Sequence, residues 1–317
     1  MNIKTKNLFS PLSLPILFFL SAILAGTILL HCQFSYLGSS ITWLDSLFTA
    51  TSATCVTGLT VVDTGSAFSQ TGQTIIIILI QLGGLGIMTF TSLAFYLLKN
   101  RVSLTDRIAV GQSLLHDSSF HLGKFLIQII VVTFTIELFG ALFLFCLDSL
   151  NFSFFSAIFH SISAFCNAGF SLNPDSLILL RGNWPINLTI MLLIILGGLG
   201  FSVIVEGKSH LLSLVKGKDR AKRMSWHFII VVQTSLFLII VGWLYIYFSE
   251  FISFKKYLPF HEAVLTSLFQ SVTCRTAGFN TLDIGSMTNV SLIFMMILML
   301  IGGAPGSCAG GIKVTTF

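Results

Sequence analysis

The segment Phe48-Thr-Ala-Thr-Ser-Ala-Thr-Cys-Val-Thr-Gly58 recurs twice in related form, and this recurrence decides the fold. The second copy is Phe159-His-Ser-Ile-Ser-Ala-Phe-Cys-Asn-Ala-Gly169, and the third is Leu268-Phe-Gln-Ser-Val-Thr-Cys-Arg-Thr-Ala-Gly278. The closing glycines are 111 and 109 residues apart, and each copy is semi-polar and follows a long apolar stretch. A fixed period of this kind predicts a chain built from repeated structural units.

A second glycine motif follows each copy. Leu82-Gly-Gly-Leu-Gly86 matches Leu196-Gly-Gly-Leu-Gly200, and Ile301-Gly-Gly-Ala-Pro-Gly306 stands at the equivalent point. The predicted unit is therefore an outer helix, a short helix that ends in a glycine loop, and an inner helix. For the two Leu-Gly-Gly-Leu-Gly motifs, close packing between helices is an equally good explanation.

Composition identifies a membrane protein. Apolar residues make up 54% of the 317 residues and charged residues only 9%, and the mean hydropathy is +0.92. A soluble domain of this size needs more polar surface. Five apolar stretches approach the roughly 20 residues that a membrane span requires: 15–31, 125–147, 187–206, 228–248 and 289–301. A signal peptide is the alternative for the first stretch, but its apolar run is too long, so we favour a retained helix.

The net charge of +5 indicates orientation and not nucleic-acid binding. Twelve of the 17 basic residues lie in alternate segments: Lys4, Lys6, Lys99, Arg101, Arg107, Lys124, Lys208, Lys216, Lys218, Arg220, Lys222 and Arg223. The positive-inside rule makes these segments cytoplasmic, together with the N-terminus of a multi-pass protein of the cell membrane. The predicted units are then repeat 1 at 1–98, a cytoplasmic loop at 99–124, repeat 2 at 125–206, a cytoplasmic loop at 207–225 and repeat 3 at 226–317.

The glycine loops are candidates for an ion-selectivity filter. The chain between outer and inner helix must start and finish on the same side, so it dips into the membrane and returns. Irregular backbone at that depth occurs where it lines a water-filled path or is buried in protein. Cation filters use rings of backbone carbonyls, and glycine allows the backbone angles that such rings need. The candidate filter residues are Cys55, Val56, Thr57, Gly58, Cys166, Asn167, Ala168, Gly169, Arg275, Thr276, Ala277 and Gly278.

Enzymatic activity is not expected. The six cysteines form no CxxC and no Cys/His metal spacing, and no catalytic cluster of Ser/His/Asp or paired carboxylates stands out. No covalent cofactor is predicted.

Four longer motifs resemble the Trk/Ktr/HKT superfamily of potassium transporters, most of all its KtrB/TrkH-type membrane subunits. They are Thr54-Cys-Val-Thr-Gly-Leu-Thr-Val-Val-Asp-Thr-Gly65, Gln81-Leu-Gly-Gly-Leu-Gly-Ile-Met-Thr89, Thr273-Cys-Arg-Thr-Ala-Gly-Phe-Asn-Thr281 and Gly302-Gly-Ala-Pro-Gly-Ser-Cys-Ala-Gly-Gly-Ile-Lys313. The resemblance implies an all-α integral membrane fold like a potassium channel, with potassium uptake through the filter. It also implies a homodimer in lipid and a cytoplasmic nucleotide-binding regulatory subunit.

The run from Gly302 to Gly311 is too rich in glycine, with a proline inside, to hold a stable helix, so the third inner helix is expected to break there. By resemblance this break is the gate below the filter, with candidates Gly302, Gly303, Pro305, Gly306, Gly310, Gly311 and Lys313. Lys313 alternatively marks the cytoplasmic end of the helix.

The superfamily pattern has four repeats and this chain shows three. We therefore expect a C-terminally truncated chain that is incomplete and does not conduct alone. The alternatives are a secondary transporter of another solute, working by alternating access, or a non-conducting fragment. The sequence leaves open whether sodium or protons couple to or activate transport.

Four single residues carry further expectations. Arg275 is predicted to brace the filter from behind, reaching Glu262 or Asp283. Glu137 is either a hydrogen-bonded structural residue or a sensor of the coupling ion. His160 and His261 are expected to face the membrane interface.

Overall fold

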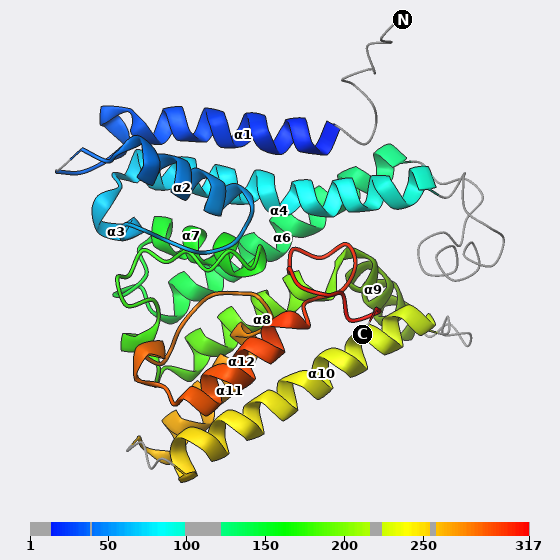
Figure 1. Cartoon of the computed structure of the whole chain (residues 1–317). Helices are drawn as coiled ribbons and strands as arrows, with labels where there is room; N and C mark the ends of the chain where they lie inside the picture. Colours follow the sequence, from blue (N-terminus) through cyan, green and yellow to red (C-terminus); the bar gives the residue numbers. More distant parts are fainter. Residues whose placement is uncertain (1–13, 39, 99–121, 216–223, 254–257, 317) are drawn as a thin grey trace, which may run out of the picture.

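The computed structural model describes residues 14–38, 40–98, 122–215, 224–253 and 258–316 (Figure 1). Lys4, Lys6 and most of the basic residues expected to orient the chain lie outside these ranges. The all-α expectation is confirmed, since the described residues contain helices and no strand. The α-helices are α1 (Leu14–His31), α2 (Trp43–Thr54), α3 (Thr64–Ala67), α4 (Gln70–Leu98), α6 (Leu122–Leu147), α7 (Phe154–Phe165), α8 (Trp184–Leu199), α9 (Phe201–Val215), α10 (Trp226–Ile246), α11 (Phe260–Thr273) and α12 (Asn289–Leu300).

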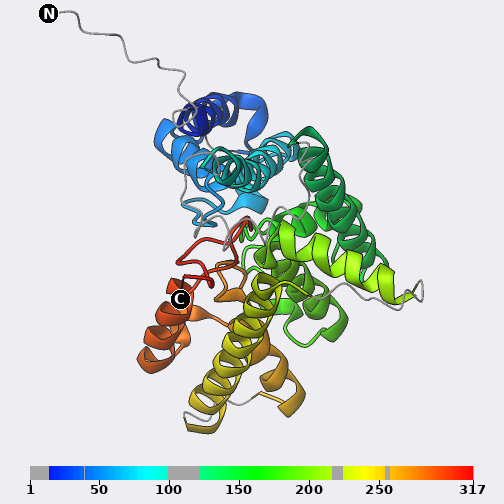
Figure 2. The same cartoon turned by 90° about the vertical axis from the view of Figure 1, so that its right-hand side faces the viewer.

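The helices pack in three groups. In the first, α1 contacts α2 and α4; in the second, α6 contacts α7 and α8; in the third, α10 contacts α11 and α12. Neighbouring groups touch through an inner helix and the next short helix, because α4 contacts α7 and α8 contacts α11. Figure 2 shows the three groups around a central region, where the last residues of the described chain also lie.

Each group contains one short, largely buried helix: α2, α7 or α11. Thr42 caps α2 in a reciprocal box with Asp45, and Ser153 caps α7 through the Ser156 backbone N–H. The helices α2 and α7 have 12 residues each. At 1.5 Å per residue they are about 18 Å long, well short of the roughly 30 Å hydrocarbon core. They can enter a membrane but cannot cross it.

The outward faces of the longer helices are apolar. Along α1, a stripe at every fourth position is exposed: Ile16, Leu20, Leu24 and Ile28. Two described helical stretches, Ile127–Leu147 and Trp226–Ser253, are long and apolar enough to cross a membrane, and α8 with α9 would make a third if they form one span. Exposed apolar side chains in such number suit lipid and not water.

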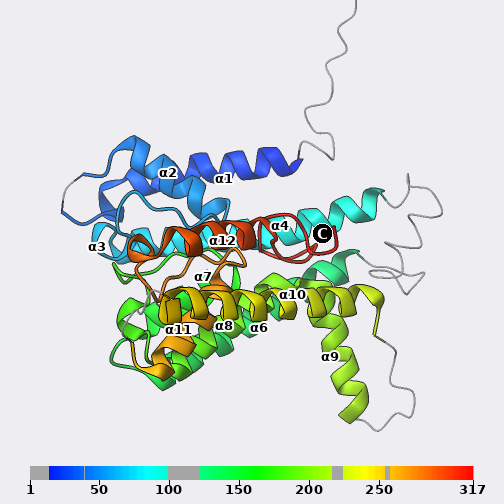
Figure 3. The same ribbon diagram turned by 60° about the horizontal axis from the view of Figure 1, so that its bottom comes forward.

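The second inner helix is broken where the sequence predicted one span over 187–206. Helix α8 ends at Leu199, α9 begins at Phe201, and the two are bent by 106°. The segment 207–225, predicted as a cytoplasmic loop, begins as helix, because α9 continues to Val215. Figure 3 shows α9 leaving the body of the molecule at a steep angle.

Contacts with the C-terminal segment explain the break. Gly200 has φ +81°, which glycine adopts without a Cβ penalty. The last carbonyls of α8 have partners from outside the helix: Ala304 N–H donates to Gly198 O at 2.9 Å, and Cys308 N–H donates to Gly197 O at 3.2 Å. In the other direction, Phe201 N–H donates to Gly306 O at 3.2 Å. The helix end is therefore satisfied by another chain segment.

Candidate functional site

The three glycine loops share an unusual backbone. Two positions in each loop, the closing glycine and the residue two before it, lie in the left-handed region. The φ angles are 56° at Val56, 78° at Gly58, 56° at Asn167, 70° at Gly169, 62° at Thr276 and 86° at Gly278. A non-glycine residue at positive φ costs about 1–2 kcal/mol. Recurrence of this strain at one position in three separate loops points to a task for the backbone itself.

The loops meet through their glycines. A Cβ atom built on Gly58 would lie 2.4 Å from Ala168 O, and one on Gly169 would lie 2.7 Å from Ala277 O. A Cβ on Gly278 would be 3.0 Å from the Gly169 Cα. The first loop therefore touches the second and the second touches the third, with no room for side chains. The predicted filter residues come together although they are more than 100 residues apart in sequence.

The helix ends before the loops add a common electrostatic feature. Helices α2, α7 and α11 are each followed by a C-cap cysteine with right-handed helical backbone angles, directly before the loop: Cys55, Cys166 and Cys274. The C-terminal end of a helix carries a partial negative charge of about half an elementary charge. Three such ends next to three adjacent loops favour a cation.

The third short helix is one residue out of step with the glycine register of the sequence comparison. Ser161 donates to Glu137 O at 2.6 Å, three residues before Gly140; Ser271 makes the same bond to Ile239 O at 2.7 Å, three residues before Gly242. Ser161 stands eight residues before its loop glycine and Ser271 only seven. The third unit thus has one residue fewer between this serine and its loop glycine, which the ungapped comparison missed.

Glycines of the inner helices allow close approach to the loops. A Cβ on Gly83 would lie 2.0 Å from Thr54 O, and one on Gly197 would lie 1.8 Å from Phe165 O. Both carbonyls belong to the last turn of a short helix. At these two positions the packing explanation of the Leu-Gly-Gly-Leu-Gly motif holds.

A buried polar cluster lies behind the second loop. The Glu137 side chain of α6 is 4% exposed and accepts a hydrogen bond from Gln81 Nε2 of α4 at 3.1 Å. The Cys166 thiol lies 3.8 Å from Glu137 Oε1. Of the two interpretations of Glu137, the hydrogen-bonded one matches these contacts, since the residue joins α4, α6 and the C-cap of α7.

Arg275 does brace the third loop, but with a different partner from the two predicted. The residue is only 7% exposed, and its Nη2 donates to Ser235 Oγ of α10 at 3.2 Å. Asp283 instead caps its own turn by accepting from Gly285 N–H. The side chain of Arg275 therefore points toward the outer helix and only its backbone belongs to the loop.

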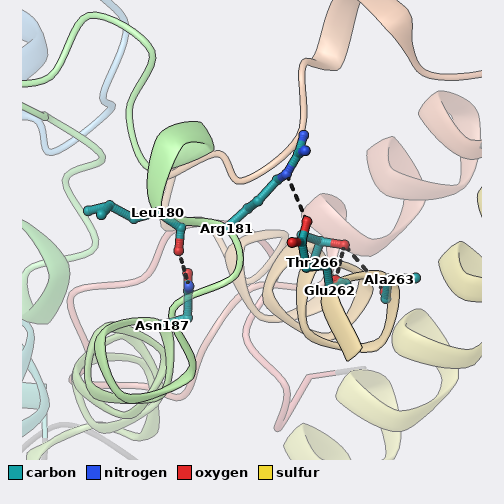
Figure 4. A network of polar contacts seen from close by, with 6 residues as sticks. All are labelled: Leu180, Arg181, Asn187, Glu262, Ala263 and Thr266. Atoms are coloured by element: carbon teal, nitrogen blue, oxygen red, sulfur yellow. Dashed lines mark hydrogen bonds and ion pairs between the residues drawn. The ribbon is translucent and has the colours of Figure 1, made fainter. Parts of the chain in front are cut away.

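Glu262 pairs with Arg181, as Figure 4 shows. Arg181 Nε lies 3.1 Å from Glu262 Oε2, which joins the segment before α8 to the start of α11. The neighbouring Leu180 carbonyl accepts from Asn187 Nδ2 at 2.7 Å, so the residue before Arg181 is held on α8. This contact connects the second group of helices to the third.

The two histidines differ in position. His261 is exposed at the start of α11, whereas His160 is fully buried in α7. The expectation of an interfacial position is wrong for His160, because its ring is enclosed by Phe152, Phe159 and Phe279.

The candidate gate residues form a closed turn after α12. Ile312 N–H donates to Leu300 O and Gly302 N–H donates to Ile312 O, both at 2.9 Å. A Cβ on Gly302 would lie 1.6 Å from Gly310 O, so the turn has no space for a side chain there. Lys313 Nζ donates to Ala309 O at 2.6 Å and closes the same turn.

This turn, residues 302–313, is called the gate turn after its predicted role. It contacts both the third loop and the break in the second inner helix. Gly310 N–H donates to Thr276 Oγ1 at 2.9 Å, which ties the turn to a predicted filter residue. On its other side lie Gly197 and Gly198 of α8. The role of Gly200 was missed from sequence, although its motif aligns with Gly306 of the turn.

Comparison with known proteins gives a consistent result. A family model described as TrkH, cation transport protein, matches residues 16–317. The Ktr system potassium uptake protein B of Bacillus subtilis is 39% identical over 321 residues, covering 99% of this chain and 70% of that protein. The potassium/sodium uptake protein NtpJ of Enterococcus hirae is 36% identical over 304 residues, covering 94% of this chain and 66% of that protein.

A solved structure shares the fold. The crystal structure of the potassium transporter TrkH from Vibrio parahaemolyticus superposes with a TM-score of 0.73 at 20% sequence identity. The match covers 99% of this chain and 60% of the TrkH chain. The chain described here therefore spans between about 60% and 70% of the length of these similar proteins.

Proposed function

The chain belongs to the TrkH family of cation transport proteins, and on this basis we propose that it takes part in potassium uptake across a membrane. The observation that carries the proposal is the meeting of three loops with the same left-handed backbone at Gly58, Gly169 and Gly278. Backbone carbonyls held in this way can replace the water shell of a potassium ion. The family consists of transporters and not of enzymes.

In this proposal the three helix groups are channel-like repeats. The short helices α2, α7 and α11 are pore helices, and the glycine loops are filter segments. The gate turn lies against the third filter segment through the Gly310–Thr276 hydrogen bond, so it is well placed to block the path. Opening then requires the turn to leave both Thr276 and the end of α8.

Partners and the driving ion are further parts of the proposal. The name of the Bacillus relative describes a member of a system, which supports a second component, here a cytoplasmic nucleotide-binding subunit docked on the basic side. A homodimer in the cell membrane, with a cytoplasmic N-terminus, completes the arrangement. Sodium is the candidate coupling or activating ion, because the Enterococcus relative is named for potassium and sodium.

Rubidium uptake tests the proposal. A potassium-uptake-deficient bacterium receives the chain alone, or the chain together with the part of the Bacillus protein that it does not cover. We expect uptake in the second arm and only background in the first. An excess of potassium should suppress rubidium uptake, whereas sodium at the same concentration should not. Failure of both arms, with the chain present in the membrane, would refute the proposal.

A further inference from the structure

His160 is the only fully buried imidazole among the described residues. It stands on α7, and its ring centroid lies 5.2 Å from that of Phe152 and 6.4 Å from that of Phe279, the residue after the third loop glycine. A polar ring among aromatic neighbours is stable only when both nitrogens have hydrogen-bond partners. Its surroundings provide them.

Those partners determine where the ring proton lies. The Ser156 carbonyl oxygen, 2.8 Å from Nδ1, can only accept, so Nδ1 carries the hydrogen. The Leu172 N–H, 3.4 Å from Nε2, can only donate, so Nε2 is an acceptor. The Ser171 hydroxyl, 3.1 Å from Nε2, donates to the same nitrogen. The ring is therefore neutral in this arrangement.

The two bonded segments lie on opposite sides of the second loop. Ser156 belongs to the first turn of α7, whereas Ser171 and Leu172 follow Gly169 by two and three residues. The ring thus fixes the exit of the loop to the helix that precedes it. The exit also supports the first unit, because a Cβ on Gly65 would lie 1.9 Å from Leu172 O.

The corresponding residues of the other short helices are Thr49 and Gln270, once the one-residue offset of α11 is included. Both are polar and buried, at 2% and 1% exposure. Only the second unit has an imidazole here. Gln270 shows that an amide side chain is accommodated at this position of the fold.

We infer that His160 is a positioning residue for the second filter loop: its neutral ring fixes Ser171–Leu172 and thereby the backbone spacing at Gly169. The hydrogen bonds of His160 do not depend on the proposed function, whereas the consequence for ion selectivity rests on it. The residue does not touch the ion path; it acts through the loop.

Two substitutions separate the two ring nitrogens. The amide of His160→Gln reaches the place of Nε2 and can accept from Leu172 N–H. The shorter amide of His160→Asn replaces only Nδ1 and can donate to Ser156 O. Hydrogen–deuterium exchange of the peptide 170–174 is measured on the purified 317-residue chain in lipid nanodiscs. We expect exchange near wild type for His160→Gln and about tenfold faster for His160→Asn, as loss of one hydrogen bond allows.

Thr49→Val is the matched control, because it removes a buried hydroxyl without a partner and should leave the 170–174 peptide unchanged. The same variants are tested for uptake when the chain is expressed together with the part of the Bacillus protein that it does not cover. The ratio of rubidium uptake to sodium uptake should fall in His160→Asn and stay at the wild-type value in His160→Gln. The inference would be overturned if the 170–174 peptide exchanged equally fast in wild type and His160→Asn. It would also be overturned if exchange became faster by the same factor in both variants. If the two variants differ in exchange as expected but the wild-type chain shows no rubidium uptake, the inference holds and only the proposed function is refuted.

Discussion

Positive φ angles at Val56, Asn167 and Thr276 are a costly local feature that the three loops share. At about 1–2 kcal/mol each, they amount to roughly 3–6 kcal/mol, a large part of the 5–15 kcal/mol that keeps a typical domain folded. Specific contacts hold at least two of them. Thr276 Oγ1 accepts from Gly310 N–H at 2.9 Å. The Asn167 amide reaches Ala164 O and Ile194 O at 3.1 and 3.2 Å when its nitrogen faces these carbonyls.

At Gly169, backbone angle and crowding act together, and a substitution can separate them. Gly169→Ala places a Cβ at φ 70° and 2.7–2.9 Å from backbone atoms of the third loop. Gly38→Ala meets a similar angle, φ 72°, with no atom within 4 Å. We expect a loss of about 1 kcal/mol in free energy of unfolding for Gly38→Ala and at least about 3 kcal/mol for Gly169→Ala. Denaturant unfolding in detergent measures both, and equal losses would show that the loops are not in contact.

Among the elements, the three inner helices differ more than their similar glycine motifs suggest. Helix α4 continues through Gly83–Gly86, α8 is broken at Gly200, and α12 ends at Leu300 before the gate turn. The second and third inner helices depend on each other, since the carbonyls of Gly197 and Gly198 accept hydrogen bonds from Cys308 and Ala304. We expect the break in α8 and the shape of the gate turn to change together.

Gly200→Ala tests this dependence. A Cβ there would lie 2.9 Å from Pro305 O at φ 81°, so the bend and the turn cannot both keep their geometry. We expect faster hydrogen–deuterium exchange at the Ala304 and Cys308 amides, together with lower thermal stability. Gly198→Ala is the matched control, because the nearest atom to its Cβ is 3.7 Å away and helical alanine is favourable. Unchanged exchange in Gly200→Ala would show that the two segments are independent.

The sequence predicted the elements that depend on local pattern, and it failed where distant segments decide. Period and composition were sufficient for the helical class, the short semi-polar helices and the glycine loops. The break at Gly200 was not predictable, because its cause is hydrogen bonding with residues about 100 positions further along. The same holds for Arg275, whose partner Ser235 is an ordinary polar residue inside an apolar helix. His160 was misplaced because two of the rings that enclose it, Phe152 and Phe279, come from outside α7.

At the scale of the whole molecule, the outward faces of the longer helices carry large apolar side chains, where a soluble protein would carry polar ones. Phe139 and Phe143 of α6 are 58% and 59% exposed, while Leu144 on the same helix is fully buried. On α1, Leu24 is 52% exposed and Leu30 is fully buried. Large exposed apolar residues of this kind are stable only where lipid or another protein covers them. The fold thus specifies which helix faces must be covered, and we expect lipid to cover them.

Photolabelling from within the bilayer tests this assignment on the intact protein. A lipid that carries a carbene-generating group on its acyl chain is mixed into nanodiscs, and labelled residues are identified by mass spectrometry. We expect adducts on Leu24, Phe139 and Phe143, because their side chains extend into the acyl region. Leu30 and Leu144 serve as fully buried controls on the same two helices. Equal labelling of these controls would show that the helices are rotated relative to the structure. Absence of adducts on α6 alone would show that another protein covers this face, as a second copy in the proposed dimer would.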